Sequence, residues 1–122
     1  MVEILPLEAE NVIAIRMIGR IDAQDMDRII EAAEPKLADG GKLRVYVEVD
    51  AFDGITFEAL GKDMKWGLKH ALDFKAKAVV SELRWAEKLA QVFDRLFPRI
   101  PLRHFQPDQK DEAWDWITGD LT

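Results

Sequence analysis

Strand-like and helix-like segments alternate along nearly the whole chain, and this alternation limits the available folds more than any other feature. Runs rich in β-branched residues, typical of covered strands, occupy Asn11–Gly19, Leu43–Val49 and Lys75–Ser81. Between them lie longer segments whose apolar residues recur three and four positions apart, the spacing of an amphipathic helix. Repeated strand–helix–strand order predicts parallel pairing with right-handed crossovers.

The expected order of elements is ββαβαβαβα, an α/β fold with a mixed, mostly parallel five-stranded sheet and about four helices. A short polar stretch separates Val2–Leu5 from Asn11–Gly19, so we expect these two strands to form an antiparallel hairpin. Asp22, with Asp25 three residues later, predicts the start of the first helix, and Thr56 predicts the start of the second. Because no linker or repeat interrupts residues 1–122, we expect a single domain.

The composition is that of a globular protein and argues against several classes of function. A net charge of −6 disfavours nucleic-acid binding, which needs a cationic surface. The chain has no cysteine, which excludes disulfides and cysteine-based zinc sites. No apolar run approaches the length of a transmembrane helix, and from the first residues we expect no signal peptide. We therefore expect a cytoplasmic protein.

Motifs of common catalytic, cofactor and metal sites are missing from the sequence. Neither GxxxxGK[ST] nor GxGxxG occurs, and HExxH is also missing. His70 and His104 stand on different predicted elements, and Ser81 is not part of a GxSxG motif. We expect no cofactor, no metal ligands and no catalytic residues, so the prediction is a protein that is not an enzyme.

The stretch VYVEVDAFDGITFEAL contains an acidic turn between a predicted strand and a predicted helix. Asp50 and Asp53 flank this turn, and two neighbouring carboxylates can divide acid and base roles between them. Turn chemistry explains them as well, because aspartate accepts hydrogen bonds from its own backbone and Gly54 can supply a positive φ; we favour this interpretation. Open α/β sheets bind ligands at the carboxyl ends of their strands, so Asp50, Asp53, Gly54 and Thr56 are predicted to border a partner-docking site.

Arg16 and Glu48 are charged residues in the middle of otherwise apolar strands. Burying either charge alone would cost several kcal/mol, which is why such groups are normally paired. If the first crossover places the two strands side by side, the two charges can meet across the sheet. We predict a contact or shared polar network between Arg16 and Glu48, with Tyr46 nearby, and interpret it as a structural ion pair.

The segment Thr56–Phe74 predicts a helix with two distinct sides. One side carries an apolar stripe of Phe57, Leu60, Met64, Leu68, Ala71 and Leu72. The other side carries Lys62, Lys65, Trp66 and Lys69. This cationic strip either docks an anionic group or acidic partner, or is a solvated face with Trp66 against the domain or at a dimer interface.

A second strongly amphipathic segment, Trp85–Phe97, predicts another helix. We predict a cleft between it and Thr56–Phe74 that holds an apolar or amphipathic ligand. The candidate lining residues are Met64, Trp66, Leu68, Trp85, Leu89 and Phe93. Exposed aromatic side chains on such elements also mark interfaces, so a homodimer is an open alternative.

The stretches LRVYVEVDAFDGITFEAL, DMKWGLKHALDFKAKAVVS and LFPRIPLRHF resemble the SpoIIAA-like proteins, small bacterial domains with a STAS-like fold related in shape to CRAL-TRIO lipid-binding domains. The resemblance covers nearly the whole chain and implies this fold. In STAS anti-sigma antagonists, the corresponding loop places a phosphorylatable serine at a helix start. Here Thr56 is the only hydroxyl of the loop, and Asp50 and Asp53 would oppose an added phosphate.

Three functions follow, in order of preference. The first is a non-enzymatic binding or regulatory module that holds an apolar, lipid-like or amphipathic small ligand, or a protein partner. The second is a STAS-type regulator switched by phosphorylation near Thr56. The third is a hydrolase that uses Asp50, Asp53 or Glu48 as its base, and no nucleophile or metal set in the sequence accompanies these carboxylates.

Overall fold

The computed structural model describes residues 1–7, 9, 11–38, 42–82, 91, 95 and 100–119. Its strands and α-helices are β1 (Val2–Ile4), β2 (Val12–Ile21), α1 (Ala23–Ala38), β3 (Leu43–Ile55), α2 (Phe57–Lys69), β4 (Phe74–Val80), β5 (Leu102–Phe105) and α4 (Lys110–Thr118). Short 3₁₀ turns precede β4 and α4. Of the helix expected at Trp85–Phe97, only residues 91 and 95 are described, and both are helical.

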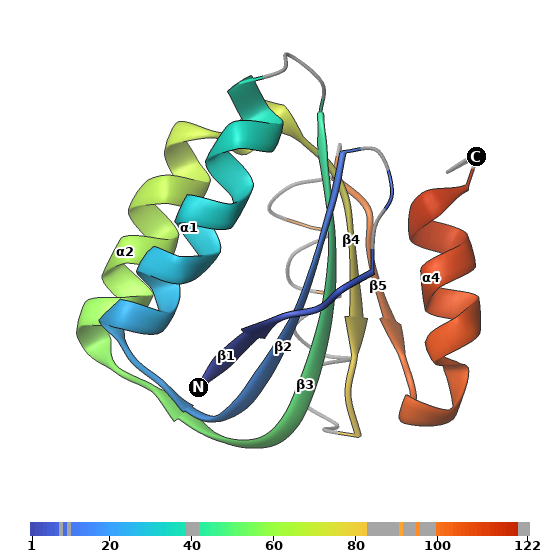
Figure 1. Cartoon of the computed structure of the whole chain (residues 1–122), viewed down its shortest axis with the longest axis horizontal. Coiled ribbons are helices and arrows are strands. Elements are labelled where there is room, and N and C mark those ends of the chain that lie inside the picture. The colour runs from blue at the N-terminus through green and yellow to red at the C-terminus, as the bar shows by residue number, and fades with distance from the viewer. Residues whose placement is uncertain are drawn as a thin grey trace.

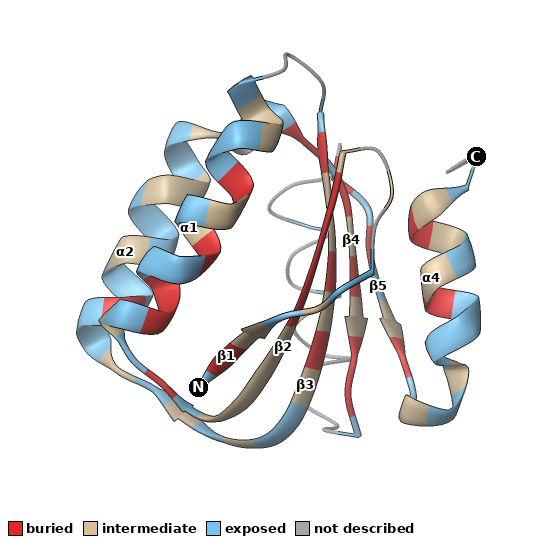
Figure 2. Ribbon diagram, in the orientation of Figure 1, coloured by how far each residue is buried: buried red, intermediate tan, exposed pale blue. Residues whose placement is uncertain are grey.

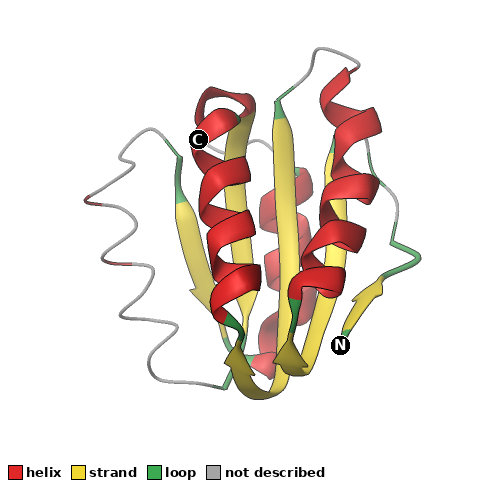
Figure 3. Ribbon diagram, turned by 90° about the vertical axis from the view of Figure 1, so that its left-hand side faces the viewer, coloured by secondary structure: helices red, strands yellow, loops and turns green. Residues whose placement is uncertain are grey.

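The five strands form one sheet in which the spatial order β1-β2-β3-β4-β5 follows the chain. β1 pairs antiparallel with β2, and the remaining pairs are parallel. Helices α1 and α2 cover one face of the sheet, while α4 lies on the opposite face (Figure 1). Figure 3 looks onto the α1 and α2 side. The predicted fold class is confirmed, with three α-helices in the described part of the chain.

Period-two alternation along β2 divides its side chains between two cores. Ile13 and Ile15 join the cluster beneath α1 and α2, whereas Val12 and Ala14 join the cluster beneath α4. Successive side chains of a strand point to opposite faces, so both faces of this sheet are apolar where helices cover them. Figure 2 shows the resulting buried residues along the central strands. No helix in the described residues combines the length and apolar character needed to cross a membrane.

The helix starts agree with the capping residues expected from the sequence. The Asp25 amide donates to Asp22 Oδ1 and the Asp22 amide donates to Asp25 Oδ2, both at 3.0 Å. This reciprocal pair satisfies amides that the first turn of α1 leaves without helical partners. At the start of α2, Thr56 Oγ1 accepts from the Ala59 amide at 3.1 Å.

The acidic stretch after Val49 is not the tight turn that its composition indicates. β3 continues to Ile55, and its pairing with β2 passes from Ile18↔Asp50 to Arg20↔Gly54 through a register shift. Three residues of β3 therefore stand opposite one residue of β2, which makes this a β-bulge. The bulge bends the end of the strand, because Ala51 has φ 46° and Gly54 has φ 116°.

The apolar stripe of helix α2 faces away from the sheet, whereas a helix that covers a sheet ordinarily turns its apolar side toward it. The large side chains of its predicted apolar stripe are exposed, from 40% at Leu60 to 94% at Phe57. Trp66, about 180° around the helix from Phe57, packs instead against the core under α1. From the expected cationic strip, Lys62 pairs with Asp27 of α1 at 2.8 Å. The strip's inner part thus faces α1 and the core, while the apolar stripe faces outward.

Candidate functional site

Three strands place charged side chains in one row across the sheet. Glu3 of β1 is the register partner of Arg16 in β2, and Arg16 is the register partner of Glu48 in β3. Side chains directly opposite one another on neighbouring strands point to the same face. The signs alternate along the row, and Arg16 Nη1 lies 3.5 Å from Glu3 Oε2.

Glu48 stands at one end of this row and is its most buried member, with a side chain 9% exposed against 34% for Arg16 and 44% for Glu3. Its Oε1 accepts hydrogen bonds from Arg16 Nε at 3.2 Å and Nη2 at 3.0 Å. Its Oε2 accepts one from the Tyr46 hydroxyl at 2.8 Å, and Lys110 Nζ of α4 lies 3.3 Å from Oε1. The contact expected between Arg16 and Glu48, with Tyr46 nearby, is present. That its role is structural stays a prediction.

The network changes the proton affinity of its members. Burial acts to raise the pKa of Glu48, but the hydrogen bonds from Tyr46, Arg16 and Lys110 outweigh it and hold that pKa below its ordinary value. Burial, reinforced by the hydrogen bond to Glu48, raises the pKa of the Tyr46 hydroxyl. At neutral pH Glu48 is therefore an anion with both oxygens engaged, an arrangement poorly suited to a general base.

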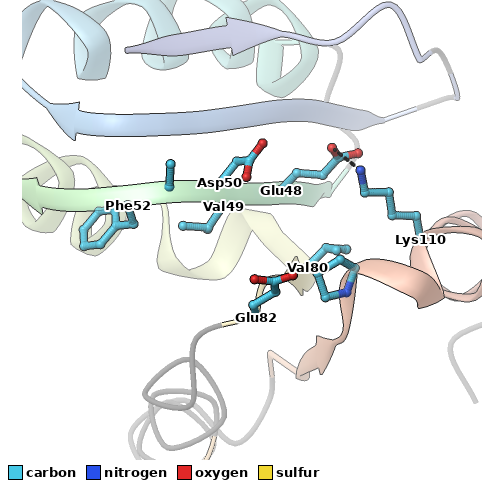
Figure 4. Close-up of a pocket in the computed structure, with 9 residues that line it drawn as sticks. Glu48, Val49, Asp50, Phe52, Val80, Glu82 and Lys110 are labelled. Carbon is cyan, nitrogen blue, oxygen red and sulfur yellow. Dashed lines mark ion pairs between the residues drawn. The ribbon is translucent and has the colours of Figure 1, made fainter.

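A cleft of about 250 Å³ opens beside this network at the carboxyl ends of β3 and β4. The described residues that line it are Glu48, Val49, Asp50, Ala51, Phe52, Val80, Glu82, Pro107 and Lys110. In Figure 4, Lys110 reaches from the start of α4 toward Glu48, and Asp50 lies farther along β3. Asp50 and Glu82 are exposed, so these two carboxylates make the mouth of the cleft acidic.

The β-bulge shapes one wall of the cleft. Ala51 and Phe52, which stand in the bulge, are both lining residues. A non-glycine residue in the left-handed region, such as Ala51, costs about 1 kcal/mol or more, and such residues cluster at functional sites. Bulges serve a similar purpose, since they redirect side chains near binding sites.

Of the four residues predicted to border a docking site, one lines the cleft and three are not among its described lining residues. Asp50 is among the described lining residues of the cleft, whereas Asp53, Gly54 and Thr56 follow it toward α2. The backbone amide of Thr56 donates to the Ile21 carbonyl at 2.9 Å, which fixes the helix start to the end of β2. The role of all four residues in binding stays a prediction.

A second, largely apolar cavity of about 150 Å³ lies between α1, α2 and the sheet. Trp66 lines it, packs edge-on against Phe74 with ring centroids 5.4 Å apart, and donates from Nε1 to Glu34 at 3.1 Å. Met64 and Leu68 are not among its described lining residues and are exposed. The other three predicted ligand contacts, Trp85, Leu89 and Phe93, fall outside the described residues. The predicted ligand cleft therefore stays a prediction.

Each of the two histidines has a ring nitrogen close to an oxygen atom of another residue. His70 Nδ1 lies 2.8 Å from Asp73 Oδ2, and His104 Nε2 lies 2.8 Å from the Ser81 carbonyl oxygen. Within the described ranges, no three histidine, aspartate or glutamate side chains are grouped so as to hold a metal ion.

Sequence reasoning missed Lys110 and Glu82 as parts of the site. Lys110 contacts Glu48 because α4 returns over the sheet, and Glu82 reaches the cleft because β4 ends beside β3. In the sequence, both are ordinary charges near the ends of predicted elements. Only the assembled sheet distinguishes them from the other exposed charges.

Comparisons with known proteins agree on one fold. The sequence model of the SpoIIAA-like family matches residues 12–118. A crystal structure of an uncharacterised DUF3478-family protein with a SpoIIAA-like fold, from Shewanella loihica PV-4, is similar with a TM-score of 0.80 and 22% identity, covering 95% of this chain and 93% of that one. The anti-sigma factor antagonist SpoIIAA in its unphosphorylated form is similar with a TM-score of 0.64 and 12% identity, covering 98% of this chain and 100% of that one. No curated protein matches the sequence.

Proposed function

Because this chain belongs to the SpoIIAA-like family, we propose that it is a non-enzymatic regulatory module that binds a protein partner at the carboxyl ends of β3 and β4. The observation that carries the proposal is the acidic cleft beside Glu48, which lies where open α/β sheets bind their ligands. The similar SpoIIAA structure is described as an anti-sigma factor antagonist, a name that denotes action on another protein.

The lining of the cleft suits one cationic side chain of a partner. Asp50 and Glu82 provide negative charge at the mouth, and Phe52, Val80 and Pro107 provide apolar surface. An arginine or lysine has this dual character, because its aliphatic stem packs on apolar groups while its charge meets carboxylates. A volume of about 250 Å³ accommodates a side chain, whereas small-molecule sites typically occupy about 300–1,000 Å³.

The engaged state of Glu48 supports a binding role over catalysis. Its two oxygens already contact Arg16, Tyr46 and Lys110. Glu48 is therefore a fixed part of the cleft lining and is not free to accept a proton from a substrate.

The smaller apolar cavity beside Trp66 offers weaker support for a lipid-like ligand. At about 150 Å³ it matches a benzene-sized molecule.

Selection of peptides from a random library against the purified protein tests the proposal. We expect enriched peptides to carry arginine or lysine beside apolar residues, and their binding to shift the backbone amide resonances of Asp50, Phe52 and Lys110. The double variant Asp50→Asn/Glu82→Gln should lose most of this affinity. Asp108→Asn, an exposed carboxylate that is not among the described lining residues, is the matched control. Saturable binding that the double variant leaves unchanged contradicts the proposal.

A second candidate function is a switch at Thr56. Its position as the N-cap of α2 supports this candidate, because a phosphate there would meet the positive end of the helix. Glu58 in the first turn would oppose the added charge, and Thr56 Oγ1 already accepts a hydrogen bond. Mass spectrometry of the protein isolated from cells, with Thr56→Val as control, tests the candidate. An unmodified Thr56 under all growth conditions removes it.

A further inference from the structure

The outward face of α2 and the turn that follows it carries a row of five large apolar side chains. Their exposed fractions are 94% for Phe57, 40% for Leu60, 58% for Met64, 66% for Leu68 and 80% for Leu72. A soluble helix normally turns such residues toward its own core. We call these five residues the outer row. A row of this extent marks an interaction surface.

The outer row is nearly symmetric in sequence about its middle residue. Counted from Met64, its other members stand at positions −7, −4, +4 and +8. If a second α2 is laid antiparallel on the first with Met64 opposite Met64, Leu60 meets Leu68 of the second copy, and Phe57 comes within one position of Leu72. A surface that matches itself under a two-fold rotation is the requirement for an isologous dimer.

Gly61 gives the outer row a depression beside Met64. It is exposed, and a Cβ built on it would meet no atom within 4 Å beyond its chain neighbours and the backbone of its own helix. Glycine inside a helix is unfavourable relative to alanine, and nothing in the described part of the chain requires it here. In the antiparallel arrangement, Leu68 of the second copy lies opposite this position and can enter the depression.

The flanking charges are complementary in the same arrangement. Glu58, Lys65 and Lys69 lie on one flank of the outer row, and all three are exposed. Antiparallel two-fold pairing sets this flank against itself, which brings Glu58 of each copy within one position of Lys69 of the other. The two Lys65 side chains approach each other near the centre, and as long exposed groups they can diverge into solvent.

The exposed area is sufficient for a specific interface. The outer row presents apolar surface on the order of 600 Å² per molecule, so two copies would bury on the order of 1,200 Å² from these residues alone, the lower end for specific interfaces. We propose that the chain forms a two-fold symmetric homodimer in which the outer rows of two α2 helices pack antiparallel around Met64. This proposal is independent of the partner site at the acidic cleft.

Sedimentation velocity over about a hundredfold range of concentration tests the assembly. We expect the wild-type chain to sediment as a dimer, and Met64→Glu or Leu68→Glu to raise the dissociation constant at least on the order of 30-fold, as for a central interface residue. Both side chains are exposed, so circular dichroism should show an unchanged fold. Leu7→Glu, which alters an exposed leucine outside α2, is the matched control and should leave the dimer intact.

Charge reversal tests the pairing of the flanks. Glu58→Lys and Lys69→Glu should each weaken the dimer, and the double variant should restore it, because the two reciprocal pairs are then rebuilt with opposite sign. Binding of the helix to an anionic surface would respond differently, since it would follow the net positive charge of α2. A double variant no better than the single variants argues against the proposed register.

Single cysteines test the register directly, because the chain contains none of its own. Under mild oxidation, Met64→Cys should form a disulfide-linked dimer. Phe57→Cys alone should not, because its two copies would lie about 20 Å apart along the antiparallel helices. Mixing Phe57→Cys with Leu72→Cys should restore crosslinking between unlike chains.

Three results would overturn the proposal. The first is a wild-type chain that stays monomeric at the highest concentration. The second is a dimer that Met64→Glu leaves intact. The third is a monomer that binds vesicles of phosphatidylcholine and phosphatidylglycerol through the outer row, which would assign the surface to a membrane.

Discussion

The carboxylate of Glu48 accepts two hydrogen bonds from Arg16, at 3.0 and 3.2 Å, although the two residues stand on neighbouring strands and 32 positions apart in the sequence. Each is the other's register partner. A one-residue slip of β2 against β3 would turn one of the charges to the opposite face of the sheet. The pair is therefore well placed to oppose such a slip.

Glu48→Gln should lower the free energy of unfolding by about 2 kcal/mol, because it leaves Arg16 and Lys110 without their shared anion. Urea unfolding followed by circular dichroism measures this change. Glu3→Gln removes the exposed carboxylate at the other end of the row and should change stability by no more than about 0.5 kcal/mol. If the two substitutions lower the free energy of unfolding equally, the burial of Glu48 does not strengthen its contribution to stability.

Stability should fall as the solution is acidified, and Glu48 should account for part of the fall. Its pKa in the folded protein is lowered, so its contribution is complete at neutral pH, above the unfolded pKa. It is lost as the pH drops below the ordinary glutamate value and through the lowered one. Urea midpoints measured at successively lower pH should converge for wild type and Glu48→Gln. Curves that stay parallel throughout would contradict this assignment.

Two glycines should respond oppositely to alanine. Gly67, in α2, has an ordinary helical φ and open space where a Cβ would be, so Gly67→Ala should stabilise the fold by about 0.5–1 kcal/mol. Gly54 has equal space but a φ of +116°, so Gly54→Ala should destabilise it by about 1–3 kcal/mol. Thermal unfolding of the two variants side by side provides the measurement. A stabilising Gly54→Ala would mean that the β-bulge does not hold this conformation.

Thr56→Ala should destabilise the protein by about 1 kcal/mol, because the first turn of α2 loses the oxygen that accepts from the Ala59 amide. Thr56→Ser keeps that oxygen and is the matched control. Chemical denaturation of both variants distinguishes them. If serine and alanine are equally destabilising, the methyl group and not the cap is the stabilising part of Thr56.

The strand order and the Arg16–Glu48 contact could be predicted because each depends on local chemistry. Alternating strand and helix patterns allow few topologies. A charge in the middle of an apolar strand requires a partner, and the neighbouring strand offered one. The cap at Thr56 follows for a similar reason, since a hydroxyl before an apolar segment has an evident use.

The bulge in β3 and the outward face of α2 could not be predicted, because both are decided by tertiary structure. Asp50 to Gly54 have the composition of a turn, but pairing with β2 keeps the segment in the sheet. The apolar stripe of α2 has ideal core spacing, whereas contacts of Trp66 with the core and of Lys62 with Asp27 fix the rotation of the helix. Periodicity identifies the two sides of a helix but does not say which side is covered.

The order of strands in the sheet also has a consequence for how the protein forms. Each strand pairs with the one that precedes it in the chain, so the described sheet can lengthen at one edge as successive segments become available. Among the described strands, no later one has to enter between two that are already paired. Since the entropic cost of closing a loop rises with its length, this neighbour-by-neighbour order keeps each loop closure shorter than a sheet paired out of chain order would require.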